Sequence, residues 1–412
     1  MTQGETLGKE FSFVKGNYAI IVLSWILIDF ASEIPATYYA LYVLKLGATE
    51  TILGIIGLMG FLALASMQFP GGYLADKFGR KWLVSSMTFG VALSFVLYAI
   101  APSWPLILIG VVLMNFFNSI YQPALMAIIA DSLPSEKRGM GFSIIMMITS
   151  TSTTPGPLVA GFLKNTFGLV QGMRIAYGIV VVLFLTAAFL RFLLKETYVQ
   201  TPKPSLKEFF RSYPTSLREG FKVWKRVPLA MFYLFLSGAI MMFGVAAVQI
   251  YLVDYAVNVL RVDPIIWAYV LTTLPISAIV FAFPIGRIID KSSRKLPVLA
   301  AYVFIFSSLL LFVRGNIFML FLSLVLLGIG MVMLNAGSGA LQADLTPRES
   351  RGKVQGFSSF FNYIVMALGV FLGGFLYDHY SPELPFYLAM AFIVPAFLLT
   401  LAFVHEPKER EE

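Results

Sequence analysis

The chain carries the segment GGYLADKFGRK at residues 71–81 and a related segment, IGRIIDKSSRK, at residues 285–295. The two copies align Asp76 with Asp290 and Arg80 with Arg294, and they are 214 residues apart in a chain of 412 residues. A segment repeated at half the length of the chain indicates that the protein consists of two related halves.

Three further pairs of segments repeat in the same order. ADSLPSEKRG at 130–139 matches ADLTPRESRG at 343–352, which aligns Asp131 with Asp344 and Arg138 with Arg351 at an offset of 213 residues. PGPLVAGFL at 155–163 matches LGVFLGGFL at 368–376 at the same offset, and LKET at 194–197 is echoed by VHEP at 404–407. The shared order and spacing predict two parallel repeats, one in each half.

The composition places the chain in a membrane. Hydrophobic residues make up 58% of it and charged residues 13%, whereas soluble domains carry about 25% charged residues. The mean hydropathy of +0.82 agrees with exposure of apolar surface to lipid. The chain has no cysteine and two histidines, so we expect no disulfide, no thiolate nucleophile and no metal site.

Apolar runs set the number of predicted spans. A bilayer core about 30 Å thick requires about 20 apolar residues per helix. The sequence has twelve such runs and therefore predicts an all-α membrane protein with twelve transmembrane helices. The runs are 18–44, 52–74, 82–101, 106–130, 142–163, 173–194, 228–253, 265–289, 296–313, 317–341, 357–377 and 384–404.

Basic residues set the predicted orientation. If alternate loops are assigned to the cytoplasm, 24 of the 30 lysines and arginines fall on the cytoplasmic side. The positive-inside rule then predicts cytoplasmic N and C termini in a cell (inner or plasma) membrane. This topology also accounts for the net charge of +8, so membrane lipid is an expected partner and nucleic acid is not.

One long polar segment divides the chain. Residues 195–226 carry eight basic and three acidic side chains, with apolar residues at every third or fourth position. This pattern predicts a cytoplasmic basic amphipathic linker that lies on the membrane surface. The predicted domains are therefore an N-terminal six-helix bundle at 1–194, the linker at 195–226, and a C-terminal six-helix bundle at 227–412.

The repeated motifs resemble those of the major facilitator superfamily, most closely its drug/proton antiporter branch. The segment G-Y-L-A-D-K-F-G-R-K is similar to the family's signature loop, and A-D-x-x-P-x-x-x-R-G is similar to its continuation after span four. The resemblance implies alternating access, with a charged gate on the cytoplasmic side. It assigns that gate to Asp76, Arg80 and Arg138 in the first half and to Asp290, Arg294 and Arg351 in the second. A carboxylate beside guanidinium groups and a helix N-terminus can form such a reversible latch.

Two features depart from the antiporter pattern. The span-four arginine of that branch would fall at about Val111, so its role in proton relay has no candidate in this span. The span-five glycine motif is partial, because serines stand at 143 and 152 where that motif has glycines. Both departures weaken the resemblance to the antiporters and leave the fold prediction intact.

The two halves differ most in their first spans. Because the repeat carries the shared scaffold, we expect functional residues where the halves differ. Asp29 and Glu33 lie within span one, and their counterparts in span seven fall near Met242 and Ala246. A carboxylate at the bilayer midplane costs about 2.5–3.5 kcal/mol, so it must be neutralised, paired or hydrated. We therefore predict that these acids bind protons and substrate.

Aromatic and amide side chains extend this predicted site. Trp25 lies one helical turn before Asp29, and Tyr39 stays near the same face if Pro35 does not shift the register. An aromatic wall beside a carboxylate suits an organic cation. Neutral hydrogen-bonding candidates, each of which could instead join helices, are Asn115, Asn118 and Gln122 on one face of span four, with Gln249 and Asn335 as weaker ones.

The sequence lacks the common motifs of enzyme active sites and of nucleotide binding. It has no phosphate-binding loop, serine-hydrolase elbow, zinc-protease motif or dinucleotide fingerprint, so we expect neither an enzyme nor a cofactor. We also expect no lysine or arginine deep in a span, which argues against organophosphate or nitrate substrates.

The sequence predicts a monomeric secondary active transporter that works by alternating access and exports lipophilic cationic or neutral small molecules against an inward proton flow. A symporter or facilitator for a sugar or small metabolite is the alternative. A flippase or a non-transporting receptor on the same scaffold is a third interpretation.

Overall fold

The protein is helical throughout its described part. The computed structural model describes residues 14–68, 79–133, 138–197, 214, 227–291, 293–346 and 351–406, and the regular elements in these ranges are all helices. The first half contains α2 (Gly16–Ala36), α3 (Tyr39–Lys45), α4 (Glu50–Ser66), α6 (Arg80–Ile100), α7 (Trp104–Ser132), α8 (Arg138–Thr153), α9 (Gly156–Phe167) and α10 (Leu169–Phe192). The second half contains α12 (Leu229–Gln249), α13 (Leu252–Asp254), a π-helix (Tyr255–Val259), α14 (Pro264–Lys291), α15 (Lys295–Val313), α16 (Ile317–Leu345), α17 (Arg351–His379) and α18 (Leu384–Phe403).

Ten of these helices are long and apolar enough to cross a membrane: α2, α6, α7, α10, α12 and α14 to α18. The predicted run 52–74 corresponds to α4, a shorter apolar helix of 17 residues, and the end of this run lies outside the described residues. The predicted run 142–163 corresponds to two helices, α8 and α9. The chain is thus a multi-pass membrane protein, while the full count of twelve spans stays a prediction.

Three predicted spans are interrupted rather than continuous. In span one, α2 contains Pro35 and ends at Ala36. A backbone hydrogen bond from Tyr38 N to Pro35 O (3.2 Å) closes a turn before α3 begins at Tyr39. Proline removes a backbone donor and clashes with the preceding turn, which explains this break. Span five breaks between α8 and α9 beside Pro155, and span seven passes from α12 through α13 into the π-helix. These breaks place irregular backbone between the two halves.

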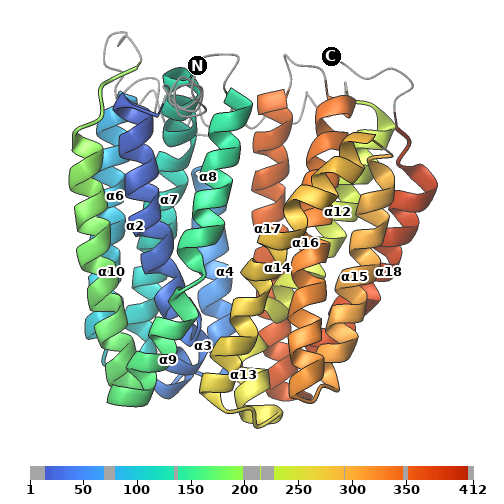
Figure 1. Ribbon diagram of the computed structural model, residues 1–412. Coiled ribbons are helices and arrows are strands. Elements are labelled where there is room, and N and C mark those ends of the chain that lie inside the picture. The colour runs from blue at the N-terminus through green and yellow to red at the C-terminus, as the bar shows by residue number, and fades with distance from the viewer. Residues whose placement is uncertain are drawn as a thin grey trace, which may run out of the picture.

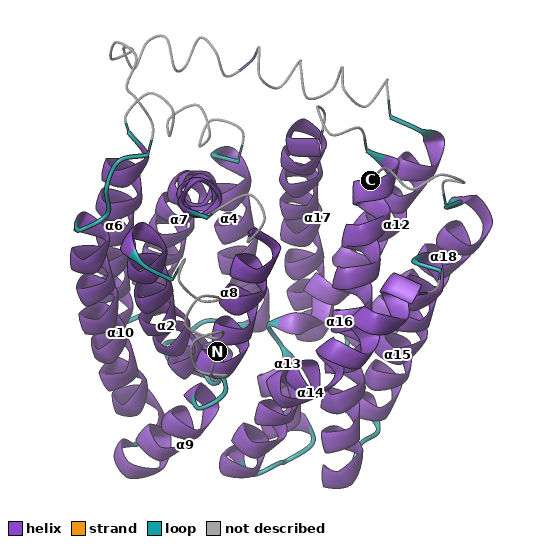
Figure 2. Cartoon of the chain, turned by 45° about the horizontal axis from the view of Figure 1, so that its top comes forward, coloured by secondary structure: helices purple, strands orange, loops and turns teal. Residues whose placement is uncertain are grey.

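The helices form two groups that lie side by side (Figure 1). Within the first group α6 packs against α7 and α10, and within the second α12 packs against α17 and α18. The oblique view in Figure 2 shows the same separation. The groups meet where α4 packs along α17 and where α8 and α9 pack against α14. This grouping follows the division of the sequence at the linker; the boundaries 1–194 and 227–412 stay predictions, and most of 195–226 lies outside the described residues.

Gly156 and Gly369, which the repeat aligns, lie at two equivalent helix crossings. A Cβ at Gly156, which begins α9, would lie 2.7 Å from Cβ of Glu33 in α2. A Cβ at Gly369 in α17 would lie 3.2 Å from Cβ of Ala246 in α12. Glu33 and Ala246 are themselves counterparts at the offset of the repeat. The crossing of span one with span five therefore repeats as the crossing of span seven with span eleven.

We call the end at which α2 begins and α18 ends the terminal end, and the opposite end the distal end (Figure 1). Both described chain ends lie at the terminal end, and its assignment to the cytoplasm stays a prediction. At the distal end hydrogen bonds join the two groups. Tyr38 Oη donates to Pro264 O (2.5 Å), and Thr51 Oγ1 donates to Asp378 Oδ2 (2.6 Å). Tyr251 Oη also lies 3.1 Å from Val370 O and 3.3 Å from Glu50 O.

Candidate functional site

A cavity of about 550 Å³ lies within the first group of helices. Its walls come from α2, α3, α4, α6, α7 and α10, and Ile250 of the second group also contributes. Six of the predicted site residues line it: Trp25, Asp29, Tyr39, Asn115, Asn118 and Gln122. The structure therefore brings the acid, the aromatic pair and the amide row of the sequence prediction into one place.

Asp29 is the acidic residue of this wall. It lies in the middle of α2, one turn after Trp25, and its Oδ2 is buried without a hydrogen-bond partner among the described residues. Thr149 of α8 lies beside the carboxyl group. A buried carboxylate oxygen without a donor is costly. The site therefore favours occupation by a proton, a water molecule or a cationic ligand.

Aromatic rings form much of the remaining wall. Tyr39 follows the break after α2 and still faces the cavity, with its ring 6.5 Å from that of Tyr98. Tyr98 lies 4.9 Å from Tyr177 and 5.3 Å from Phe95, measured between ring centroids. Such rings offer polarisable faces to an apolar or cationic molecule. Tyr98, Tyr177 and Phe95 escaped the sequence analysis because aromatic residues in α6 and α10 have no distinguishing pattern.

The amide side chains of α7 differ in their bonding. Asn115 Nδ2 donates to Val111 O of its own helix (3.0 Å). Asn118 Oδ1 is buried and has no hydrogen-bond partner among the described residues. Val111 itself lines the cavity, so this position contributes an apolar surface where the antiporter pattern would have arginine. Asn118 is therefore the amide best able to bind a donor group of a ligand.

Three predicted site residues lie outside the residues that line the cavity. Glu33 packs at the crossing of α2 with α9 beside Gly156. Gln249 is the exposed last residue of α12, next to Ile250, and Asn335 is exposed on α16. Glu33 and Asp29 thus share one helix, but Asp29 lines the cavity and Glu33 does not.

Arg191 corrects the expectation that no basic residue lies deep among the spans. Its side chain, in the last turn of α10, has 0% exposure. Nε donates to Ser24 Oγ (3.1 Å), Nη1 donates to Thr88 Oγ1 (2.6 Å), and the guanidinium lies 5.1 Å from the centre of the Tyr121 ring. Its burial depends on the packing of α2, α6 and α7 around α10, which its position near the end of a hydrophobic run did not indicate.

The predicted gate residues that the structure describes lie at the terminal end. Arg80 Nη1 pairs with Asp131 Oδ2 (2.5 Å) in the first half, and Arg294 pairs with Asp344 in the second. Both pairs lie within a single group of helices. Asp76 lies outside the described residues, and only the backbone is described for Arg138, Asp290 and Arg351.

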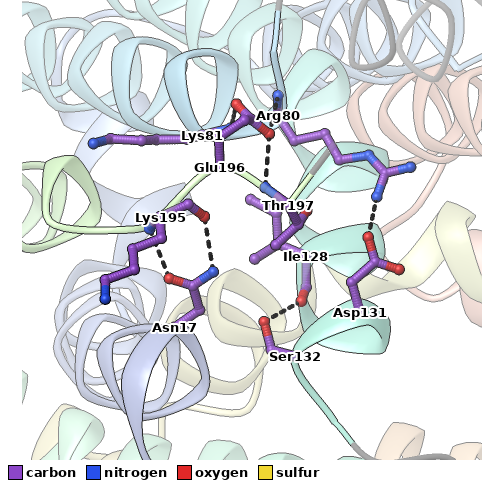
Figure 3. Close-up of polar contacts among 9 residues, drawn as sticks. All are labelled: Asn17, Arg80, Lys81, Ile128, Asp131, Ser132, Lys195, Glu196 and Thr197. Carbon is purple, nitrogen blue, oxygen red and sulfur yellow. Dashed lines mark hydrogen bonds and ion pairs between the residues drawn. The ribbon is translucent and has the colours of Figure 1, made fainter. Parts of the chain in front are cut away.

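The weakly similar segments LKET (194–197) and VHEP (404–407) play the same structural part in the two halves. Glu196 accepts hydrogen bonds from the backbone N–H groups of Arg80 (3.2 Å) and Lys81 (3.1 Å) at the start of α6 (Figure 3). Glu406 accepts from Lys295 N (2.8 Å) at the start of α15. A carboxylate at a helix N-terminus satisfies free donors and complements the helix dipole. Each half thus carries one glutamate cap and one arginine–aspartate pair in equivalent places.

Comparison with known proteins agrees with this architecture. The family model of the Major Facilitator Superfamily matches residues 21–275 and 263–412. The chain is 26% identical over 411 residues to the multidrug resistance protein MdtH of Cronobacter sakazakii, covering 97% of this chain and 94% of that protein. It is 26% identical over 321 residues to the multi-drug resistance efflux pump PmrA of Streptococcus pneumoniae, covering 77% of each chain.

Solved structures share the fold. A variant of the nucleoside transporter NupG matches with a TM-score of 0.74 at 15% identity, over 94% of this chain and 99% of that one. A bacterial homologue of the human lysosomal transporter Spinster matches with a TM-score of 0.71 at 17% identity, over 98% of this chain and 99% of that one.

The matching family and the similar proteins are transporters, so the chain is a membrane transporter and not an enzyme. The chain belongs to the major facilitator superfamily.

Proposed function

We propose that the protein is a proton-coupled exporter of lipophilic cationic or neutral compounds that works by alternating access, as a monomer and without a cofactor. The observation that carries the proposal is the carboxylate of Asp29 in the wall of a cavity rich in aromatic residues. The names of the relatives MdtH and PmrA, which describe multidrug resistance, support the substrate class.

In this scheme Asp29 binds either a proton or a cationic substrate. When Asp29 is ionised, its charge and the neighbouring rings attract an organic cation. Uptake of a proton cancels that charge and weakens the binding of the cation, so the two ligands exchange across the membrane. A neutral lipophilic substrate would use the aromatic wall and couple to the proton through the change in hydration of the cavity.

Transport by purified protein in liposomes with an imposed pH gradient tests this scheme. We expect Asp29→Asn to abolish uphill transport of a lipophilic cation such as ethidium, because the amide keeps the shape of the side chain and removes its titration. Exchange of labelled substrate down its own gradient should survive, because exchange requires no net proton movement.

Glu33→Gln is the matched control, because it removes a carboxylate one helical turn away that does not line the cavity. We expect this variant to keep most of the uphill transport. If Asp29→Asn concentrates the cation as well as the wild type does, the proposed coupling is wrong.

A carrier for a sugar or another small metabolite remains the second candidate. It is favoured by Asn118, whose carbonyl oxygen is buried at the cavity without a partner and could accept a hydrogen bond from a hydroxyl group. Uptake of labelled sugars into the same liposomes, lost in Asn118→Ala, would favour this candidate over the exporter.

A further inference from the structure

Arg191 is a buried charge that the proposed transport step does not use. Its side chain has 0% exposure, and so do those of Ser24 and Thr88, the two hydroxyl groups to which it donates. Each hydroxyl also donates to its own helix, Ser24 to Ile21 O (2.9 Å) and Thr88 to Val84 O (2.6 Å). The hydroxyl groups are therefore satisfied as donors without the arginine. Ionisable side chains among membrane spans are costly and commonly serve a function.

The guanidinium of Arg191 also contacts the ring of Tyr121 in α7. Its central carbon lies over the ring, 5.1 Å from the centre. Arginine stays protonated, so its charge is attracted to the π-electrons of the ring face, and burial strengthens this attraction. Tyr121 is 4% exposed and lines the cavity, whereas Arg191 does not line it. The arginine thus holds the ring from behind the cavity wall.

Tyr121 differs in this respect from the other tyrosines of the wall. Tyr98 lies 6.5 Å from Tyr39 and 4.9 Å from Tyr177, measured between ring centroids, so these three rings support one another. Among the described residues Tyr121 has no aromatic ring beside it, and its ring contact is with Arg191. Arg191 is therefore the specific contact that orients the Tyr121 ring.

The cavity offers a negative charge and an oriented ring on different helices. Asp29 of α2 and Tyr121 of α7 both line it. An ionised Asp29 attracts the positive centre of a ligand. The Tyr121 ring already carries a cation on one face, so it suits the flat, uncharged part of a ligand better than the positive centre. An aromatic cation has both parts and can use both features at once.

We propose that Arg191 is a positioning residue that orients the Tyr121 ring in the cavity wall, and that this ring selects cations that carry a flat aromatic group. The inference deepens the proposed function and rests on it for the substrate class. Binding to purified protein tests it without transport and without a pH gradient.

Calorimetric titration compares two ligands, ethidium, which is a flat aromatic cation, and tetrabutylammonium, which is a cation without a ring. We expect Arg191→Met to weaken binding of ethidium about three- to tenfold, because a ring that is no longer oriented loses its stacking contact with the ligand. Binding of tetrabutylammonium should change little. General damage to the cavity would instead weaken the binding of both cations.

A double-mutant cycle tests whether the arginine acts through the ring. We expect Tyr121→Leu to weaken binding of ethidium, and Arg191→Met to cost nothing further in that variant, because the ring it positions is gone. Tyr39→Leu is the matched second partner, because Tyr39 lines the same cavity and packs beside Tyr98. The losses in Arg191→Met and Tyr39→Leu should add.

Three further variants serve as controls. Tyr121→Phe keeps the ring over which the guanidinium lies and should keep the preference for ethidium. Arg174→Gln removes another arginine of α10, whose Nη2 donates to Ala101 O (3.0 Å) at the distal end, and it should leave both affinities unchanged. Arg191→Gln keeps a donor for the hydroxyl groups and covers the case in which Arg191→Met does not fold. It should give the same selective loss.

Equal losses for the two cations in Arg191→Met and Arg191→Gln would overturn the proposal. Absence of ethidium binding by the wild type would overturn it too, and so would losses that add between Arg191→Met and Tyr121→Leu. These results are distinguishable from a failure of the proposed function. If the selective loss and the coupling are found but a pH gradient drives no transport by the wild type, Arg191 still positions Tyr121 and the proposed proton-coupled export is wrong.

Discussion

At the scale of single residues, the sequence pointed to six residues of the cavity wall, in part because helical periodicity links residues four positions apart. Trp25 and Asp29 satisfy this rule and line the cavity together. Glu33 satisfies it equally well and lies at a helix crossing instead, beside Gly156. Arg191 was missed for a related reason, because periodicity shows which residues share a face and does not show which neighbour covers that face.

Gly60 gives a prediction at this scale. A Cβ at this position in α4 would lie 2.7 Å from Val111 Cγ1 and 2.9 Å from Asn115 Nδ2, both in the cavity wall. We expect Gly60→Ala to push Asn115 into the cavity and to weaken binding of a lipophilic cation about tenfold, the effect of about 1.4 kcal/mol. Equilibrium binding to purified protein measures the change.

Gly238→Ala in α12 is the matched control for Gly60→Ala, because a Cβ there meets nothing within 4 Å. It should leave the affinity unaltered. Normal affinity in Gly60→Ala would mean that the cavity tolerates the added methyl group and that its shape does not limit binding.

At the scale of whole elements, the hydrophobic runs located the helices but did not predict where they break. The break after α2 carries the usual signal, a proline at 35. The break after α12 has no proline, and the chain there passes through a three-residue helix and a π-helix. Such irregular backbone is stabilised by tertiary contacts, for example by Asp254, which accepts hydrogen bonds from Tyr377 (2.6 Å) and Asn258 (2.5 Å). The contact with Tyr377 joins residues 123 positions apart in the sequence, so no local pattern reveals it.

The crossing of α12 with α17 gives a prediction for packing between elements. A Cβ at Gly373 would overlap the backbone carbonyl of Ala247, which cannot move without shifting α12. We expect Gly373→Ala to lower the stability of the protein by about 1–3 kcal/mol, because small residues allow helices to approach closely in membranes. Thermal unfolding in detergent measures the loss.

Gly356→Ala, on the same helix, is its matched control, since a Cβ there meets nothing within 4 Å. Equal melting temperatures for the two variants would contradict the close packing at Gly373.

At the scale of the whole molecule, the internal repeat predicted more than the topology. It paired Arg80 with Arg294 and Asp131 with Asp344, and the structure shows the same arginine–aspartate contact in both halves. It also paired Glu196 with Glu406, and both cap equivalent helices. The distal hydrogen bonds could not be predicted in this way, because they join one half to the other and have no counterpart within a single repeat.

Those distal contacts bear on alternating access. If the two groups of helices rock about the cavity, opening the distal end must break the hydrogen bond between Thr51 and Asp378, which joins α4 to α17. A hydrogen bond to a charged group contributes about 1.5–3 kcal/mol. We therefore expect Thr51→Val to favour the state that is open at the distal end, about tenfold or more in the ratio of the two states. Distances between spin labels placed at the distal ends of α4 and α14 report this ratio.

Two controls separate loss of this hydrogen bond from a change of side chain at position 51 and from loss of a hydroxyl group elsewhere. Thr51→Ser keeps the hydroxyl group and should retain the distances of the wild type. Thr186→Val in α10 removes a hydroxyl group that donates to Val182 O of its own helix (2.8 Å), and it should also leave the distances unchanged. If Thr51→Val shows the same distribution as both controls, the contact is incidental to gating. The closed distal end would then depend on the packing of α4 against α17 and on the bond from Tyr38 to Pro264, which the valine does not disturb.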